Sequence, residues 1–346
     1  MEHQVSDILI NTWAAMVTLI LFMYVALDGF DLGVGVLSLL EQDSYKKSLM
    51  MRSLGGVWDA NETWLVLLGG TLFGAFPLAY AAALQALYFP VMLMLFALIF
   101  RGVAFEFCLY AKTSAVWVFA FGIGSLLAIV AQGLALSCLL SGIVAQSLVL
   151  SGLLSGLWLN NITGTTPIFN WVTPFSLVTV ALLITTYSLL GATYLFAKVD
   201  GTLRQSAAVW ASRSTILLAA LLVIFFLFGP INTPFVTERW SQHLFYFGIL
   251  LFIMAVMLLL LLWSLKQKHY SSPFILCLVT LFIILVGLVS SNYPYIVPGV
   301  MTLHAAASST KTLEFMLYAE GGLLPLMLIY NGYQYYVLRG QVTENH

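Results

Sequence analysis

The segment WDANETWL at 58–65 brings the carboxyl groups of Asp59 and Glu62 and the amide of Asn61 into an apolar stretch. The residues that follow, LVLLGGTLFGAF at 65–76, carry no charged side chain and suit a helix that crosses a membrane. Ionisable groups are costly in hydrocarbon, so those that occur in membrane segments are candidates for a functional site. The alternative interpretation is a helix end that is wetted by lipid headgroups.

The composition of the whole chain agrees with a membrane protein. Hydrophobic residues make up 61% of the 346 residues and charged residues only 8%, which is too little charge for a water-facing surface. The net charge of −1 argues against a nucleic-acid partner. Three cysteines, Cys108, Cys138 and Cys277, have no metal-site spacing and are expected to pack as small apolar residues.

Windows of roughly 20 apolar residues predict an all-α integral membrane protein, a single polytopic domain over 1–346 with nine transmembrane helices. The second span has the weakest signal because Asp59 and Glu62 lower its hydropathy. The pairs Gly29/Gly33 and Gly70/Gly74 have the spacing of small-residue helix contacts. The nine predicted spans lie near 9–39, 54–78, 80–105, 115–140, 173–197, 212–230, 243–265, 273–291 and 312–338.

The basic residues predict the orientation of these spans. With nine crossings, one side of the membrane holds eleven of the thirteen lysines and arginines, and the other side holds only Arg239 and Lys311. The positive-inside rule then places the N-terminus in the periplasm and the C-terminus in the cytoplasm. The longest connection, at about 141–172, is uncharged and is expected outside. The eleven are Lys46, Lys47, Arg52, Arg101, Lys112, Lys198, Arg204, Arg213, Lys266, Lys268 and Arg339.

In this orientation two pairs of acids gather near the cytoplasmic side. Asp28 and Asp31 end the first span, whereas Asp59 and Glu62 lie about 7–12 Å inside the start of the second. Each pair has i,i+3 spacing and therefore shares a helix face, so the four could form one group that takes up protons from the cytoplasm. The structural alternative is that Asp28, Asp31 and Arg101 pair to hold three helices together.

Three further acids lie elsewhere in the predicted spans. Glu106 is a second cytoplasmic-side acid, just past Arg101, and Glu314 fits an exposed helix start. Glu320 is predicted about a third of the way into the last span, where a buried carboxyl is expected.

Histidine positions argue against haem ligation by this chain. His3 and His346 are at the termini, His269 is in a short inner loop, and His243 and His304 are at the outer interface. Haem-carrying helix bundles usually place histidine ligands in mid-membrane. We therefore predict that this chain ligates neither haem nor another metal.

Six motifs resemble subunit II of the bacterial cytochrome bd-type quinol oxidases, and their wording resembles most the cyanide-insensitive branch. The resemblance covers nearly the whole chain and is most specific in the first 110 residues. The motifs are GFDLGVG at 29–35, WDANETWLVL at 58–67, LFGAFPLAYA at 72–81, FRGVAFEF at 100–107, LGATYL at 190–195 and the segment Pro325–Tyr330.

The resemblance implies a complex in the bacterial inner membrane that oxidises quinol at its outer face and reduces dioxygen to water. It implies a homologous partner, subunit I, that carries two haem b groups, one haem d and the quinol site. Protons for water formation are expected from the cytoplasm. In some members of the family small single-helix subunits join the complex, or a structural quinone binds to subunit II.

The resemblance also implies roles for particular residues. By match to the family motif, Asp59 is expected to line a proton route, together with Asp28 and Asp31, and Trp64 is expected on a lipid-side oxygen path. The sequence departs from longer members around Leu303-His304-Ala305, where a Trp-Asp pair is usual, and at Glu320.

Two other classes of protein share some of these features. A proton-coupled secondary transporter also has intramembrane acids, but its substrate site lies near the midplane at broken helices. A purely structural membrane scaffold would tolerate the loss of Asp59.

Overall fold

The computed structural model describes residues 2–110, 114–141, 171–267, 269–340 and 342. Helices dominate this part of the chain, with one short antiparallel hairpin, β1 (Tyr295–Val297) and β2 (Met301–Thr302). The helices are α1 (Glu2–Leu40), α2 (Ser44–Leu54), α3 (Trp58–Ala75), α4 (Pro77–Ala86), α5 (Tyr88–Tyr110), α6 (Ser114–Leu140), α8 (Pro174–Lys198), α9 (Gly201–Asn232), α10 (Pro234–Gln242), α11 (Leu244–Lys266), α12 (Ser272–Asn292), α13 (Leu303–Ala306) and α14 (Thr310–Val337).

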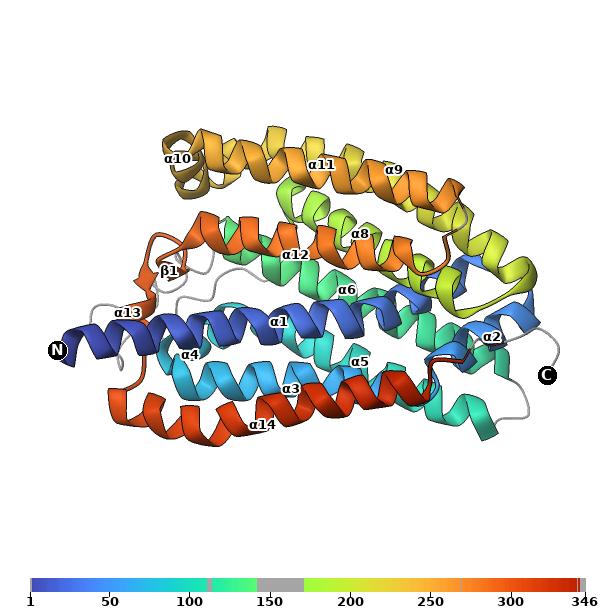
Figure 1. The fold of residues 1–346 in the computed structure, drawn as a ribbon, viewed down its shortest axis with the longest axis horizontal. Helices are drawn as coiled ribbons and strands as arrows, with labels where there is room; N and C mark the ends of the chain where they lie inside the picture. Colours follow the sequence, from blue (N-terminus) through green and yellow to red (C-terminus); the bar gives the residue numbers. More distant parts are fainter. Residues whose placement is uncertain (1, 111–113, 142–170, 268, 341, 343–346) are drawn as a thin grey trace.

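The long helices lie side by side along one axis, and the two chain termini lie at opposite ends of it (Figure 1). Eight helices of the described chain are long and apolar enough to cross a membrane, namely α1, α5, α6, α8, α9, α11, α12 and α14. The remaining predicted span corresponds to α3, whose first turns carry Asp59, Asn61 and Glu62. The membrane-spanning all-α fold is therefore confirmed, while the count of nine stays a prediction.

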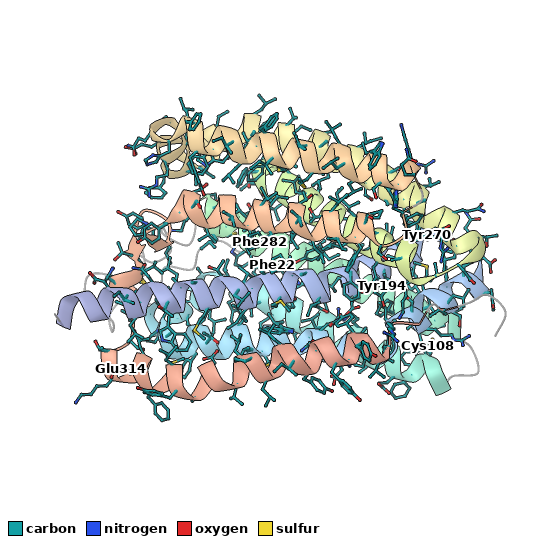
Figure 2. The ribbon with its side chains drawn as sticks, viewed as in Figure 1. Phe22, Cys108, Tyr194, Tyr270, Phe282 and Glu314 are labelled. Carbon is teal, nitrogen blue, oxygen red and sulfur yellow. The ribbon has the colours of Figure 1, made fainter. Side chains whose placement is uncertain are left out.

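The two ends of the molecule carry unequal numbers of basic residues. Helix α2, with Lys46, Lys47 and Arg52, and the end of α11, with Lys266, lie at the end opposite the start of α1 (Figure 1). Helix α10, with Arg239, and the first turn of α14, with Lys311, lie at the other end. Figure 2 shows the same two ends, with Glu314 at one and Tyr270 and Cys108 at the other. This agrees with the charge pattern of the sequence, and the orientation in the membrane stays a prediction.

The predicted third span, 80–105, is wrong at its start. The chain forms the short helix α4 and breaks at Leu87 before α5 begins. Pro90 explains the break, because in a continuous helix its ring would clash with the carbonyl of Ala86 and its missing N–H would leave that carbonyl unpaired. The uncharged connection predicted at about 141–172 lies almost wholly outside the described residues.

Two helices extend well beyond the predicted spans. Helix α9 begins at Gly201 rather than at 212, and α1 has 39 residues, which corresponds to about 58 Å of helix. A hydrocarbon core is about 30 Å thick, so both helices extend past it. Leu203, Arg204, Gln205, Ala207 and Ala208 near the start of α9 are good helix formers, and the hydropathy of the sequence alone does not reveal that this polar segment belongs to the helix.

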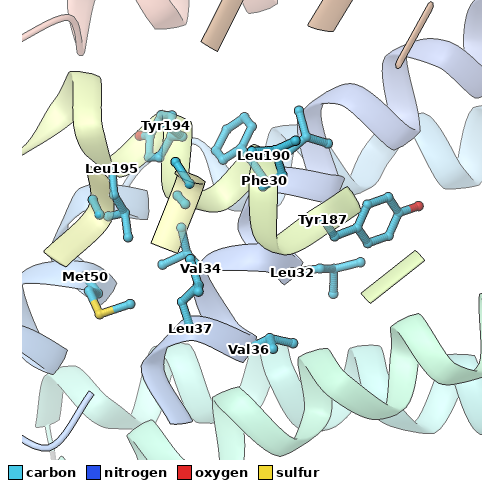
Figure 3. Close-up of a cluster of buried hydrophobic side chains, with 14 of the residues drawn as sticks. Phe30, Leu32, Val34, Val36, Leu37, Met50, Tyr187, Leu190, Tyr194 and Leu195 are labelled. Carbon is cyan, nitrogen blue, oxygen red and sulfur yellow. The ribbon is translucent and has the colours of Figure 1, made fainter. Parts of the chain in front are cut away.

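The core lies where the second half of α1 packs against α8, and Figure 3 shows this cluster of buried apolar side chains. A Cβ atom added to Gly33 would lie 1.8 Å from the carbonyl oxygen of Tyr187, and one added to Gly191 would lie 2.5 Å from the nitrogen of Val34. Only glycine allows the two backbones to approach this closely. The predicted small-residue contact is thus present at Gly33, whereas nothing in the described chain lies within 4 Å of a Cβ at Gly70.

Candidate functional site

Arg101 is the centre of a buried ionic cluster that joins three helices. Its Nη1 lies 2.6 Å from Oδ1 of Asp28 on α1, and its Nη2 donates to Oε2 of Glu62 on α3 at 2.9 Å. Arg101 and Asp28 are 1% and 0% exposed, while Glu62 is 27% exposed. The pairing predicted for Asp28 and Arg101 is therefore present, and Glu62 shares the same guanidinium.

Asp31 belongs to a separate branch of this cluster. Its Oδ2 accepts a hydrogen bond of 2.8 Å from Nδ2 of Asn61, and Oδ1 of Asn61 accepts one of 2.8 Å from the hydroxyl of Tyr335 on α14. The predicted pairing of Asp31 with Arg101 does not occur as a direct contact in the described structure. The amide of Asn61 instead links α1 to the last helix, so the neighbouring residues Asn61 and Glu62 connect α3 to three helices, α1, α14 and α5.

Asp59 and Glu106 lie outside the buried cluster. Asp59 is exposed in the first turn of α3, where a carboxylate is favoured by the positive end of the helix macrodipole. Glu106 is exposed on α5, beyond Arg101. Two acids, Asp28 and Glu62, therefore contact the one arginine, with Asp31 close by on α1, and Asp59 lies at the surface, three residues from Glu62 on the same helix.

A second polar chain reaches the same region from the interior. The hydroxyl of Tyr187 on α8 donates to Oε1 of Gln132 on α6, and Nε2 of Gln132 donates to the hydroxyl of Tyr24 on α1, both at 2.8 Å. Tyr24 lies one helical turn before Asp28. Sequence reasoning missed this chain, although an amide such as Gln132 in the middle of an apolar span is a signal that could have revealed it.

Trp64 lies two residues after Glu62 and is fully buried. It packs in a cluster with Ile20, Tyr24 and Leu324, between α1, α3 and α14. Its indole N–H has no hydrogen-bond partner in the described structure. The surroundings of this ring are therefore apolar, which suits packing and also the passage of a small apolar molecule.

The outer-half acids occupy two different environments. Glu320 is half-buried and accepts a short hydrogen bond from the hydroxyl of Thr71, which agrees with a partly buried carboxyl in the last span. Glu314 is exposed in the first turns of α14, as expected. His304 on α13 faces Asp7 of α1 at 3.6 Å between Nδ1 and Oδ1, and both side chains are exposed.

The described residues show no cluster of metal-ligating side chains. No group of three or more histidine, cysteine, aspartate or glutamate side chains among them converges on one point. His243, His269 and His304 lie outside the spanning helices. That this chain ligates no haem stays a prediction.

Comparisons with known proteins agree on one family. The family model described as cytochrome bd terminal oxidase subunit II matches residues 9–338. The cytochrome bd-I ubiquinol oxidase subunit 2 of Escherichia coli K12 is 27% identical over 377 aligned positions, which cover 98% of this chain and 96% of that protein.

Two further matches add detail. The cytochrome bd ubiquinol oxidase subunit 2 of Bacillus subtilis is 35% identical over 136 positions, covering 38% of this chain and 40% of that one. A chain in the structure of the bd oxidase from Geobacillus thermodenitrificans superposes with a TM-score of 0.75 and 19% identity, covering 96% of this chain and 99% of its own length. The structural match supports the same fold.

Proposed function

Because the chain belongs to the family of subunit II of cytochrome bd terminal oxidases, we propose that its acids near Arg101 deliver protons to the oxygen-reducing site of the complex. The chain is a subunit of a quinol oxidase, an oxidoreductase complex of the bacterial inner membrane. Its partner is subunit I, and the complex contains haem. The proton role of this chain's own residues is the part that we propose.

The observation that carries the proposal is an excess of acid over base in a membrane-embedded site. One guanidinium, that of Arg101, can neutralise one of the three carboxyl groups of Asp28, Asp31 and Glu62. A purely structural ion pair needs only one acid for each base. The remaining carboxyl groups give the site a capacity to hold and release protons. Asp59 is exposed at one edge, Glu62 is partly exposed and Asp28 is fully buried, so the acids form a graded path inward.

Replacement of Asp59 tests this proposal. Asp59→Asn keeps the size and part of the hydrogen-bonding capacity but cannot carry a proton, so oxygen consumption per haem should fall strongly. Asp59→Glu should keep part of the rate, because a carboxyl group remains within reach. Asp43→Asn is the matched control, because it removes an exposed acid next to α2 and asparagine is an equally good N-cap residue.

Two outcomes would contradict the proton role. Wild-type turnover in Asp59→Asn excludes it. Lost haem and lost assembly, with normal activity in each complex that does form, would instead identify Asp59 as a structural residue. A transporter would leave oxygen consumption unrelated to these acids.

We also propose that Trp64 borders the path of dioxygen. The support is the apolar cluster around a fully buried indole, one helical turn beyond Asn61 on the same helix. Dioxygen is small and apolar and reaches the complex through the membrane, so a dry route between helices suits it. Asp59 would then serve proton entry and Trp64 oxygen entry from two sides of α3.

Subunit I is proposed to pack on the face formed by α3, α5 and α14. Helix α14 carries the half-buried Glu320 and four exposed tyrosines, Tyr318, Tyr330, Tyr333 and Tyr336. Lipid tails cannot satisfy such polar groups, whereas a partner helix can. The exposed residues along α9 and α11, in contrast, are mostly leucine, isoleucine, valine and phenylalanine, which suit lipid.

The remaining expectations concern the whole complex. We propose that subunit I carries two haem b groups and one haem d, that quinol and dioxygen are the substrates, and that single-helix subunits or a structural quinone complete the assembly in the inner membrane. Membership of the cyanide-insensitive branch and the absence of haem ligands on this chain also stay predictions. No residue of this chain is assigned to the quinol site.

A further inference from the structure

An open surface hollow of about 360 Å³ lies between Lys46 of α2 and the first turns of α9, from Thr202 to Trp210. Both helices begin at the end of the molecule opposite the start of α1 (Figure 1). The lining of this pocket combines one cation, several hydrogen-bonding side chains and an indole: Lys46, Thr202, Gln205, Ser206, Val209 and Trp210. The proton and oxygen routes proposed above use none of these residues.

Several features make the electrostatic environment of the pocket favourable to an anion. Lys46 belongs to the first turn of α2 and Thr202 to the first turn of α9, so the pocket faces the positive ends of two helix macrodipoles. No carboxylate lies within salt-bridge distance of Lys46 in the described chain. Asp43 and Asp200 occupy the N-cap positions of the two helices, but neither lines the pocket.

A second cation follows on the same face of α9. Arg213 is exposed and lies seven residues, about 10 Å of helix, beyond Ser206. Helical side chains lean toward the N-terminus of their helix, which here is the end that holds the pocket. Its aliphatic stem is long enough for the guanidinium to reach toward the pocket and out of the hydrocarbon.

An apolar stripe continues from the pocket into the membrane. Val209, Ile216 and Val223 follow one another at seven-residue intervals on α9 and are 47%, 62% and 58% exposed. Trp210 packs partly against the core and borders the pocket at the level where aromatic residues mark the membrane interface. A ligand of this site thus has an anionic head between Lys46 and Arg213 and an apolar tail along α9.

We propose that this pocket binds the phosphate of an anionic phospholipid headgroup, with an acyl chain along the stripe Val209, Ile216 and Val223. The phosphate oxygens accept hydrogen bonds from Lys46, Gln205 and Ser206, and Arg213 adds a second positive charge. A phospholipid held here lies on the surface between the start of α2 and the start of α9.

Native mass spectrometry of the purified complex, titrated with dioleoylphosphatidylglycerol, tests this site. Lys46→Gln and Arg213→Gln should each weaken lipid binding about fivefold, the effect of one basic residue near an anionic membrane surface. Lys266→Gln removes the same charge at the same end of the molecule, away from the pocket, and should leave binding unchanged. Dioleoylglycerol, which has the same acyl chains and no phosphate, should not bind in a Lys46-dependent way.

Two further variants keep the test decisive. Lys46→Arg should retain the affinity, and Ser206→Leu should block the pocket without changing the charge. Equal phosphatidylglycerol binding by wild type, Lys46→Gln and Ser206→Leu would overturn the proposal. If inorganic phosphate in excess displaces the lipid and binds alone in a Lys46-dependent way, the site belongs to soluble phosphate, and the lipid assignment is wrong.

Discussion

Arg101 is the residue on which the buried ionic cluster depends, because it alone faces both Asp28 and Glu62 within the described structure. Arg101→Gln leaves the fully buried carboxyl of Asp28 without its counter-charge. Removing one partner of a buried ion pair typically costs about 3–5 kcal/mol, so we expect a large loss of assembled complex. The yield of complex per milligram of membrane protein and its thermal unfolding midpoint measure this loss.

Two companion variants separate charge from packing. Lys266→Gln removes an exposed basic side chain at the end of α11 and should leave the yield unchanged. The double variant Asp28→Asn with Arg101→Gln should assemble better than Arg101→Gln alone, because the fully buried carboxyl of Asp28 is no longer left without its counter-charge. A double variant that is as damaged as the single one would point to lost packing rather than lost charge.

The oxygen role of Trp64 gives a prediction that does not involve charge. Trp64→Ala opens the apolar cluster around the indole and should change the apparent affinity for oxygen more than that for quinol. Oxygen consumption at varied oxygen and quinol concentrations, in fully assembled complex, measures both. Ile20→Val is a suitable control, because it trims the same cluster without removing an aromatic ring. An unchanged oxygen dependence in Trp64→Ala would count against an oxygen path at this position.

At the residue scale the sequence predicted the pair of Asp28 with Arg101, but it also placed the exposed Asp59 in the group of acids and paired Asp31 with Arg101. Intramembrane charge singled out Asp28, Asp31 and Arg101, since each is costly unless it finds a partner. Which acids join the cluster depends on how α3 is rotated about its own axis. This rotation turns Glu62 toward Arg101 and leaves Asp59 exposed. Asn61 received less weight because it is uncharged, yet it links Asp31 to a helix that is far away in sequence.

The contact between α1 and α8 is the closest backbone approach described above, and a methyl group tests it. Gly33→Ala places a Cβ 1.8 Å from the carbonyl oxygen of Tyr187, so the helices must separate. Overpacking of this kind typically costs about 1–3 kcal/mol, and the unfolding midpoint of the complex should fall accordingly. Gly69→Ala is the matched control, because nothing lies within 4 Å of that added Cβ.

The control variant Gly69→Ala has its own expected effect on stability. Alanine is a better helix former than glycine by roughly 0.5–1 kcal/mol, so Gly69→Ala should leave the complex as stable as wild type or slightly more so. Equal effects of Gly33→Ala and Gly69→Ala on the midpoint would mean that α1 and α8 do not depend on this close approach.

At the element scale hydropathy located the helices well and their ends poorly. Helices α6, α8 and α12 begin and end within about two residues of the predicted spans, because a proline or serine at the start and a polar segment at the end mark them. The break at Leu87 was missed, since the apolar character of the chain continues across it. The turn at Gly56, with φ of +89°, was likewise not predicted, although glycine is the residue that such a backbone conformation favours.

Helix α14 and the pair α9 and α11 present two different exposed faces of the molecule. A photo-crosslinker placed on each face shows which of them binds subunit I. Ile329 on α14 is 69% exposed, and Phe252 on α11 is 68% exposed, so the two sites are matched. A benzophenone amino acid at position 329 should give a covalent adduct with subunit I in membranes, whereas the same group at position 252 should react with lipid. Adducts from position 252 and none from position 329 would place the partner on the α9 and α11 face.

At this scale the sequence predicted which connections lie at the same end of the molecule, because most of the basic residues belong to alternate connections. The structure gathers them as expected, with α2 and the start of α9 at one end and α10 at the other (Figure 1). The choice of partner face could not be predicted in the same way. It depends on which side chains remain exposed after packing, and a single chain that is apolar throughout does not reveal this from composition.

The ion pair between Asp28 and Arg101 has a consequence for biosynthesis. Asp28 lies in the first helix to leave the ribosome, and Arg101 follows only in α5. At about 5–20 residues per second, the interval between the two lasts roughly 4–15 s. During this time Asp28 has no counterion. We therefore expect α1 to stay at the protein-lined exit of the translocon until α5 arrives, and the first 110 residues to enter the bilayer as one unit.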